Sequence, residues 1–362
     1  MGLRVLDTSV PKCDPAPYQM NKYTKGLMVL NERRQVLKWV AGGSAIALTP
    51  QMMHFARAAD DFLKGPPVKD IPAKQIGPHV WLIYSPDGFP TPENQGMMAN
   101  ITFVVSSKGV ILLDTGASVQ IGEMAIRMIK RVTNKPVIAI FNSHYHGDHF
   151  LGNQAFVEAY GKDVPIYAHP YSIAQIKGIE GNAWRNLMER WTNQATAGTK
   201  VIAPTHAANH GNVFHYGDVR IKVHHHGVAH TPGDISMQVI EDKMTYVGDI
   251  AMGNRIANID DGSYVGTFKT YKNLQSSEGD QIWIPGHGEP SKQLLKEYGE
   301  FLAGIYETCV KAVKDGQDLS VAKSLVLKDP RVSKRAKTMQ GFDNNIGKYT
   351  SLAYLEAEKE AF

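Results

Sequence analysis

Short apolar runs bounded by turn-forming residues recur along the chain after about residue 75, and they alternate with segments of helical spacing. The runs of the first half are rich in β-branched and aromatic residues, which favours strands. Apolar residues every three to four positions predict helices between them. Strands are predicted at 79–84, 99–105, 109–114, 136–141 and 164–168, and helices at 124–132, 151–160 and 171 to about 194.

The same alternation resumes in the second half. Strands are predicted at 219–226, 235–240, 244–248 and 281–285, a helix at 267–275, and further helices from 291 onward. This pattern predicts a layered α/β architecture with catalytic groups on loops at strand ends. Trp184 and Trp191 are seven positions apart on one face of a predicted helix, and core packing is favoured over lining a substrate cleft.

A histidine-rich turn follows the apolar run 136–141. Residues 142–149 read Asn-Ser-His-Tyr-His-Gly-Asp-His, which places three imidazoles and one carboxylate within six positions. Imidazole and carboxylate are ligands of zinc and other borderline divalent ions, and neither cysteine lies near. We therefore predict a two-metal site, with a polar turn of surface histidines as the alternative. The ligands from this turn are His144, His146, Asp148 and His149.

Later segments supply further candidate ligands. His230 lies past a predicted strand in a Thr-Pro-Gly turn, and Asp249 directly follows the apolar run 244–248. His287 occupies the sequence Ile-Pro-Gly-His-Gly, again after a strand. The consecutive histidines His224 to His226 alternate across a strand end, so we expect them to be structural or to support the ligands, with His226 as the candidate exception.

Length and charge restrict the classes of function. At 362 residues and 43% hydrophobic content, the chain can form one large domain or two ordinary ones. Residues 1–58 carry eight Lys and Arg against three Asp and Glu, a net charge of +5, so the remainder carries −1 of the total +4. The residues after 58 are therefore nearly neutral and lack the clustered basic residues that nucleic-acid binding requires. We expect no nucleic-acid partner.

The basic N-terminal segment, 1–58, resembles a bacterial twin-arginine export signal. Paired arginines lie within Asn-Glu-Arg-Arg-Gln-Val-Leu-Lys, the apolar stretch after them is too short to remain in a bilayer, and Ala56-Arg57-Ala58 fits a cleavage site. We expect export to the periplasm in folded form, no stable membrane span after cleavage, and a linker at 59–74. An uncleaved anchor or amphipathic helix is the alternative, and Met20 or Met28 is an alternative start. Loss of Cys13 with the leader would leave Cys309 without a disulfide partner.

At the candidate ligands the chain resembles the metallo-β-lactamase superfamily. The resemblance covers roughly residues 75–290 and implies a four-layer αββα sandwich with the metals in a groove at one sheet edge. It rests on Asp114-Thr115-Gly116, the turn 144–149, His230, Asp249 and His287. It implies that His144, His146 and His230 bind the first metal, that Asp148, His149 and His287 bind the second, and that Asp249 bridges them. Asp114 would support the site from outside the ligand set.

The implied activity is dinuclear zinc hydrolysis, with iron or manganese as alternative metals. Water shared by two divalent cations loses a proton near neutral pH. We therefore expect a metal-bridged hydroxide to cleave an ester, thioester, lactone or amide bond of a small-molecule acyl substrate. Asp148 is expected to orient the water or to accept its proton.

The superfamily does not define the substrate. In relatives that open β-lactams with a cysteine ligand, this cysteine occupies the position of Asp249. A lysine that binds the substrate carboxylate follows it shortly after in the sequence. Residues 250–254 hold no lysine, although Arg255 comes next. Arg255-Ile256 and Asp260-Asp261-Gly262-Ser263 look instead like periplasmic metallohydrolases associated with quinoprotein and sulfur-oxidation systems. β-Lactamase-type amide hydrolysis, an iron-dependent oxidoreductase of the persulfide dioxygenase type and a non-catalytic metal-binding protein are the rival hypotheses.

Two segments outside the ligand set have open roles. Residues 85–96 join two predicted strands and carry Phe89 amid turn formers, so they form either a mobile flap over the groove or an ordinary hairpin loop. Residues 291–362 contain amphipathic helix, which we expect to pack on the domain and which is a candidate homodimer contact.

Overall fold

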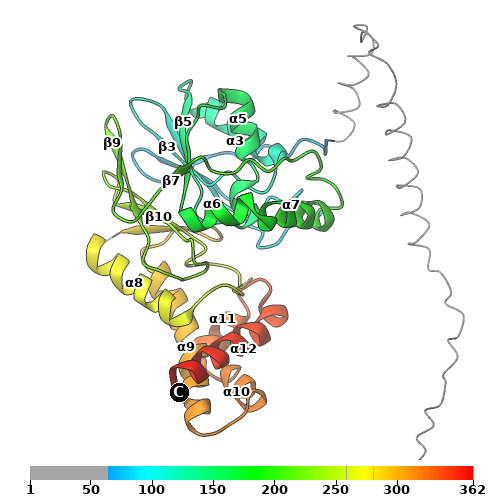
Figure 1. Cartoon of the computed structure of the whole chain (residues 1–362), viewed down its shortest axis with the longest axis vertical. Helices are drawn as coiled ribbons and strands as arrows, with labels where there is room; N and C mark the ends of the chain where they lie inside the picture. The colour runs from blue at the N-terminus through cyan, green and yellow to red at the C-terminus, as the bar shows by residue number, and fades with distance from the viewer. Residues whose placement is uncertain (1–63, 258, 280, 362) are drawn as a thin grey trace, which may run out of the picture. The chain divides into compact units, whose positions relative to one another are not determined.

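Two mixed β-sheets form the centre of the structure, a computed structural model that describes residues 64–257, 259–279 and 281–361 (Figure 1). The first sheet has the strand order β1-β2-β3-β4-β5-β6-β7. Its strands are β1 Lys74–Gln75, β2 Val80–Ile83, β3 Ile101–Val105, β4 Val110–Leu113, β5 Val137–Phe141, β6 Ile166–Ala168 and β7 His206–Ala207. Neighbours pair antiparallel from β1 to β4 and parallel from β4 to β7.

The second sheet has the order β12-β11-β10-β9-β8. Its strands are β8 Val213–Tyr216, β9 Val219–His224, β10 Ser236–Val239, β11 Met244–Gly248 and β12 Ile282–Pro285. Only β11 and β12 pair parallel among these strands of the described chain. Sequence analysis missed β8, because its residues alternate between exposed and half-buried and form no apolar run.

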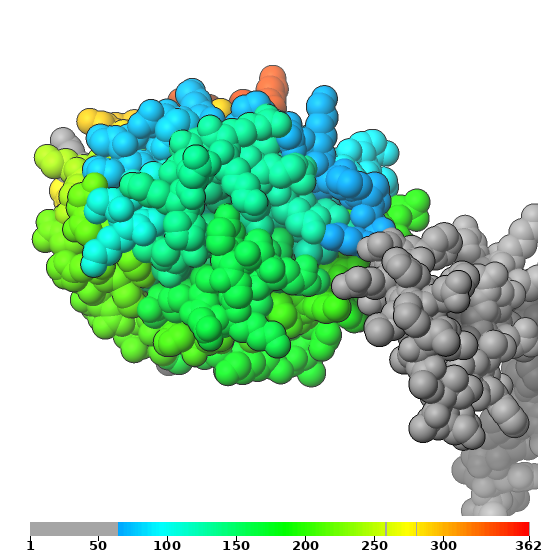
Figure 2. Space-filling view, turned by 90° about the horizontal axis from the view of Figure 1, so that it is seen from above, coloured from blue at the N-terminus to red at the C-terminus, as the bar shows by residue number. Residues whose placement is uncertain are grey.

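Helices cover the outer faces of both sheets. The helices are α3 Val119–Val132, α4 Gly147–Phe150, α5 Asn153–Tyr160, α6 Pro170–Lys177, α7 Ile179–Trp191, α8 Tyr264–Glu278, α9 Leu294–Lys314, α10 Leu319–Val326, α11 Pro330–Ala336 and α12 Phe342–Ala361. Helices α3 and α5 lie beside the first sheet, whereas α8 and the C-terminal helices lie on the side of the second sheet (Figure 1). Figure 2 shows the face that is formed mainly by residues of the first half of the chain.

Three apolar cores separate the four layers. Alternation along β4 illustrates the reason: Ile111 and Leu113 point into a core made of strands from both sheets, while Val110 and Leu112 point into a core shared with α3 and α5. A third core joins the second sheet to α8, α9 and α12. This arrangement confirms the predicted αββα sandwich.

One predicted helix is wrong in extent. The segment 171 to 194 forms two helices, because α6 ends at Gly178. This glycine adopts ψ −142, which is not helical, and its N–H donates to the carbonyls of Ala174 and Gln175. Trp184 is half-buried and packs against the core next to α3. Trp191 is 41% exposed, so the prediction that both tryptophans pack in the core is wrong for Trp191.

The described residues form one compact unit, which includes the C-terminal helices. Among the described residues, no helix is both long and apolar enough to cross a bilayer. The predicted twin-arginine signal at 1–58 and the first part of the predicted linker lie outside the described residues, so export stays a prediction.

Candidate metal centre

The seven predicted ligands meet at one edge of the two sheets. The turn 142–149 follows β5, Asp249 follows β11 and His287 follows β12. Parallel pairing of β11 with β12 brings the carboxyl ends of these two strands together, which places Asp249 beside the loop of His287. All seven side chains are buried, with no residue more than 5% exposed.

The ligands fall into overlapping groups. One group is His144, His146 and His230, and another is Asp148, His149 and His287. A third group, His144, His149 and Asp249, connects the first two. In each group one nitrogen or oxygen per residue lies within 4.8 Å of the others, so the structure brings together all the residues that the sequence proposed as ligands.

Neighbouring groups fix the tautomers of three histidines. Nδ1 of His149 lies 2.8 Å from Oδ2 of Asp114, and Nδ1 of His287 lies 2.7 Å from the carbonyl oxygen of Met98. Each Nδ1–H therefore donates, because both partners are acceptors. Ser143 Oγ donates to Asp114, so it accepts from Nδ1 of His144 at 2.9 Å. The opposite nitrogen, Nε2, of each of these rings is thereby left to face a metal ion.

Asp249 faces both groups. Its Oδ1 lies 3.4 Å from Nε2 of His149 and 3.4 Å from Nε2 of His287. Its other oxygen, Oδ2, lies 3.7 Å from Nε2 of His230. Two ligands of a tetrahedral zinc ion are about 3.4 Å apart, so these separations suit atoms that share an ion.

Several buried atoms of this centre have no hydrogen-bond partner among the described residues. Such atoms are rare in folded proteins because an unpaired buried polar group costs about 1–3 kcal/mol. The atoms are Nε2 of His144, His149 and His287, Oδ2 of Asp148 and Oδ1 of Asp249. They all belong to predicted ligands, so the donor set fits divalent metal ions.

The protonation states of five of the ligands also suit metal binding. Burial lowers the pKa of His144 and His146 well below the ordinary value and that of His230 to about 4, so these rings are neutral. Burial alone would raise the pKa of Asp148 and Asp249, but the facing imidazoles outweigh it and hold both values well below the ordinary one. Neutral imidazole and ionised carboxylate are the forms that bind metal.

His149 differs from these five ligands: burial alone would lower its pKa, but the carboxylates of Asp148, Asp249 and Asp114 outweigh burial and hold the pKa well above the ordinary value. A metal ion would therefore have to displace a proton from this ring.

Two close approaches shape the loops that carry the ligands. A Cβ atom on Gly286 would lie 2.3 Å from Oδ1 of Asp249, so only glycine fits there. In the turn that carries His230, Oδ2 of Asp234 accepts the N–H groups of His230 and Thr231 at 2.7 and 2.8 Å. Asp234 is fully buried, and this burial raises its pKa to about 7.

Arg255 lies between the centre and the loop 85–96. Its Nη2 is 3.3 Å from Oδ2 of Asp249, its Nη1 donates to the carbonyl of Gly88 at 2.6 Å, and its guanidinium carbon is 5.6 Å from the centre of the Phe89 ring. Arg255 is only 4% exposed, so its charge acts in a region of low dielectric constant. The guanidinium therefore adds a fixed positive charge directly beside Asp249.

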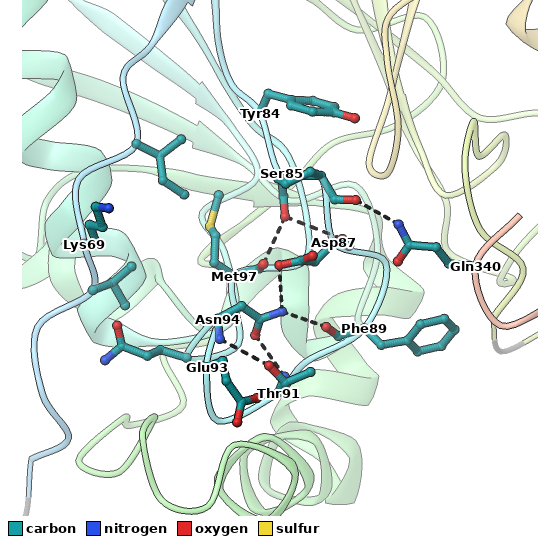
Figure 3. Close-up of a pocket in the computed structure, with 14 residues that line it drawn as sticks. Lys69, Tyr84, Ser85, Asp87, Phe89, Thr91, Glu93, Asn94, Met97 and Gln340 are labelled. Atoms are coloured by element: carbon teal, nitrogen blue, oxygen red, sulfur yellow. Dashed lines mark hydrogen bonds between the residues drawn. The ribbon is translucent and has the colours of Figure 1, made fainter. Parts of the chain in front are cut away.

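The same loop borders a cavity of about 760 Å³ (Figure 3). Asn94 fixes the loop, because its Oδ1 accepts the N–H groups of Thr91 and Gly96 and its Nδ2 donates to the carbonyl of Phe89. None of the seven ligands lines the cavity. Phe89, which does line it, contacts Arg255 and so links the cavity to the metal centre.

Some supporting residues were missed by sequence analysis. The Trp184 ring lies 4.7 Å from the ring of His146, and Asn100 donates to the carbonyls of Pro285 and Gly288 on either side of His287. Tyr246 donates to Asp114 at 2.7 Å. These residues come from distant segments and carry no local motif, so only the fold reveals them.

Comparison with known proteins agrees with this geometry. The family described as the metallo-β-lactamase superfamily matches residues 95–295, more than half of the chain. The chain therefore belongs to the metallo-β-lactamase superfamily. It is a hydrolase of the metal-dependent kind that this superfamily comprises, as the sequence predicted.

Two individual proteins are similar over different extents. A linear primary-alkylsulfatase from Pseudomonas sp. (strain ATCC 19151) is 34% identical over 68 residues, which are 18% of this chain and 13% of the sulfatase. A solved metallo-β-lactamase from Pontibacter korlensis is 19% identical, with a TM-score of 0.49, and the match covers 62% of this chain and 94% of that one.

Proposed function

We propose that the chain is a dinuclear zinc hydrolase that cleaves an ester, thioester, lactone or amide bond of a small acyl substrate. The observation that carries this proposal is the position of Asp249, whose two oxygens face two separate groups of buried imidazoles. A carboxylate in this position is suited to bridge two ions. The donor set of His and Asp without Cys suits zinc, and it is also compatible with iron or manganese.

Two bound divalent ions would acidify water and polarise the oxygen of the scissile bond. The protein contributes orientation and charge. Oδ2 of Asp148 lies 3.1 Å from Nε2 of His287, and the carboxylate stays ionised because its pKa is held low by the imidazoles that face it. Asp148 is thereby placed to accept a hydrogen bond from the attacking water and to orient it.

Arg255 and the loop 85–96 would receive the substrate. The guanidinium faces Asp249 on one side and the Phe89 ring on the other, and Phe89 also lines the cavity. A buried arginine favours a substrate with an anionic group, and Phe89 favours an apolar portion next to it. We propose an anionic, partly apolar ester or amide as the substrate class.

A second candidate is hydrolysis of a sulfate ester. The short match to the linear primary-alkylsulfatase supports it, and so does the positive charge of Arg255, which could pair with a sulfate oxygen. The match spans only 13% of that enzyme, so it does not extend to the sulfatase as a whole.

The test is turnover by the zinc-loaded chain of a panel that contains an aryl ester, a thioester, a lactone, a β-lactam and a medium-chain alkyl sulfate. We expect an acyl substrate to turn over and Asp249→Asn to lose at least about 100-fold in kcat/KM, which corresponds to roughly 2.7 kcal/mol. The control is Asp242→Asn, because Asp242 also pairs with a histidine, His79, but lies outside the centre. Turnover of the alkyl sulfate alone would select the second candidate, and no turnover by a fully loaded chain would refute both.

A further inference from the structure

A second group of histidines lies apart from the metal centre. His210, His224 and His226 each offer one ring nitrogen, and these nitrogens lie within 4.8 Å of one another. None of the three is among the seven ligands of the centre. His224 ends β9, His226 follows two positions later, and His210 lies in the loop before β8.

The backbone explains why these three side chains meet. Residues two apart on an extended chain point to the same side, so His224 and His226 share a side and His225 points away. Nδ1 of His225 instead lies 2.8 Å from the carbonyl oxygen of Asp234, and its ring stacks on His169. Pairing of β8 with β9 brings His210 to the end of β9, where the N–H of His225 donates to its Nδ1 at 3.2 Å.

The group contains an unpaired buried atom. Nε2 of His226 is inaccessible and has no hydrogen-bond partner among the described residues. The ring centres of His210 and His226 are 4.8 Å apart, and those of His224 and His226 are 6.0 Å apart. A buried nitrogen without a partner, on a ring that lies beside two other imidazoles, is better suited to coordinate an ion than to remain unpaired.

A carboxylate completes the surroundings. Oε1 of Glu278, at the end of α8, lies 3.6 Å from Nε2 of His224, close to the separation of about 3.4 Å between two ligands of one zinc ion. Nζ of Lys222 donates to the same Oε1 at 2.8 Å. The lysine balances the charge of the glutamate, so the imidazoles are the principal donors, and a bound ion would have to share Glu278 with Lys222.

The imidazoles are in the form that binds metal. Burial lowers the pKa of His224, and burial together with the neighbouring histidines lowers that of His226 to about 4. Both rings are therefore neutral at physiological pH. Imidazole donors suit the borderline ions Zn²⁺, Ni²⁺ and Cu²⁺ rather than Mg²⁺ or Ca²⁺, which prefer oxygen.

We propose that His210, His224 and His226 form a separate site for one divalent transition-metal ion, with Glu278 as an additional ligand. Coordination by Nδ1 of His210 would replace its long hydrogen bond from the backbone of His225. The ion would join the loop before β8 to the end of β9, and through Glu278 to α8. The sequence favours a structural or supporting role for His224 to His226, with His226 as the candidate exception, whereas this proposal makes both His224 and His226 ligands.

The test is the difference in bound zinc between variants of the full chain. Zinc retained per chain after dialysis against metal-free buffer is measured for the unsubstituted protein, for His210→Asn and for His226→Asn. The control is His215→Asn, because His215 is an exposed histidine of the same hairpin that lies outside the group. A difference between variants does not depend on how many ions the main centre holds.

We expect His210→Asn and His226→Asn each to lose about one equivalent of zinc, and His215→Asn to lose none. Because His210 is exposed, its substitution leaves the core intact, which keeps the test valid if His226→Asn folds poorly. Cu²⁺ bound to the same site should show hyperfine coupling to several imidazole nitrogens in its electron paramagnetic resonance spectrum, and His226→Asn should remove this signal. Equal zinc content in His210→Asn and the unsubstituted protein, or an equal loss in His215→Asn, would overturn the proposal.

Discussion

Nδ1 of His149 lies 2.8 Å from the Asp114 carboxylate, and this contact turns the opposite nitrogen of the His149 ring toward Asp148 and Asp249. The same carboxylate accepts hydrogen bonds from the N–H and Oγ of Ser143 and from the hydroxyl of Tyr246. Asp114 adopts φ 63, a conformation that aspartate and asparagine tolerate better than most residues. It therefore holds the centre together without being placed among the ligands.

Asp114→Asn should weaken zinc binding by about 10–100-fold, because it removes the charge that orients His149. Asparagine retains the size and the tolerance for positive φ, so the fold should persist. A competition titration against a zinc chelator measures the affinity. Asp242→Asn serves as the control, since it breaks the His79 pair outside the centre. An unchanged affinity in Asp114→Asn would contradict the proposed role of Asp114.

Gly286→Ala should abolish high-affinity zinc binding. The new Cβ would lie 2.3 Å from Oδ1 of Asp249 and 2.7 Å from Cε1 of His149, so one of these ligands must move. The matched control is Gly347→Ala in α12, where a Cβ meets nothing within 4 Å and alanine favours the helix by up to about 1 kcal/mol. Metal content and melting temperature of both variants check this prediction, and full zinc content in Gly286→Ala would contradict it.

Arg255→Gln should raise KM for anionic substrates by about 10–100-fold, since hydrogen bonds to charged groups contribute about 1.5–3 kcal/mol. The effect on a neutral ester of similar size should be much smaller. Arg335→Gln is a suitable control, because Arg335 donates to the carbonyl of Gly253 but makes no contact with Asp249. Equal effects of Arg255→Gln on anionic and neutral substrates would show that Arg255 does not select charge.

The thiol of Cys309 should be inert in the native protein. It is fully buried in the core next to α12, and burial raises its pKa to about 12, so almost no thiolate forms near neutral pH. In a Cys13→Ser chain, an aromatic disulfide reagent should label no thiol under native conditions and one thiol in denaturant. Rapid labelling of the native chain would show that this core opens readily.

The sequence predicted most strands and all seven candidate ligands, because both leave local signals. A continuous apolar run marks β4, and a polar ligand directly after an apolar run marks the end of β11. The contacts that orient the ligands could not be predicted in the same way. Met98, Asn100 and Trp184 reach the centre only through sheet pairing and helix packing, which no spacing rule reveals.

Local signals also failed where an element was polar or a helix was interrupted. Strand β8 is exposed on alternate residues and has no apolar run, so the sequence did not predict it. Without this strand, the sequence also offers no reason to place His210 beside His224. Gly178 interrupts a segment of otherwise helical spacing, so one helix was predicted where two exist. For the loop 85–96, the sequence does not distinguish a flap from a hairpin loop. In the structure Asn94 bonds the N–H of Thr91 and the carbonyl of Phe89, and these contacts form only once the loop has folded back on itself.

The most direct test of the dinuclear centre is the metal content of the purified chain compared with that of His287→Asn and His230→Asn. Each substitution removes a ligand from a different group, whereas Asp249 remains. All three chains carry His210→Asn, which removes the proposed separate site. We predict about two zinc ions per chain with His210→Asn alone, and about one after either His287→Asn or His230→Asn is added. A content of one ion in that background, with the same ion lost in both variants, would contradict two separate metal positions.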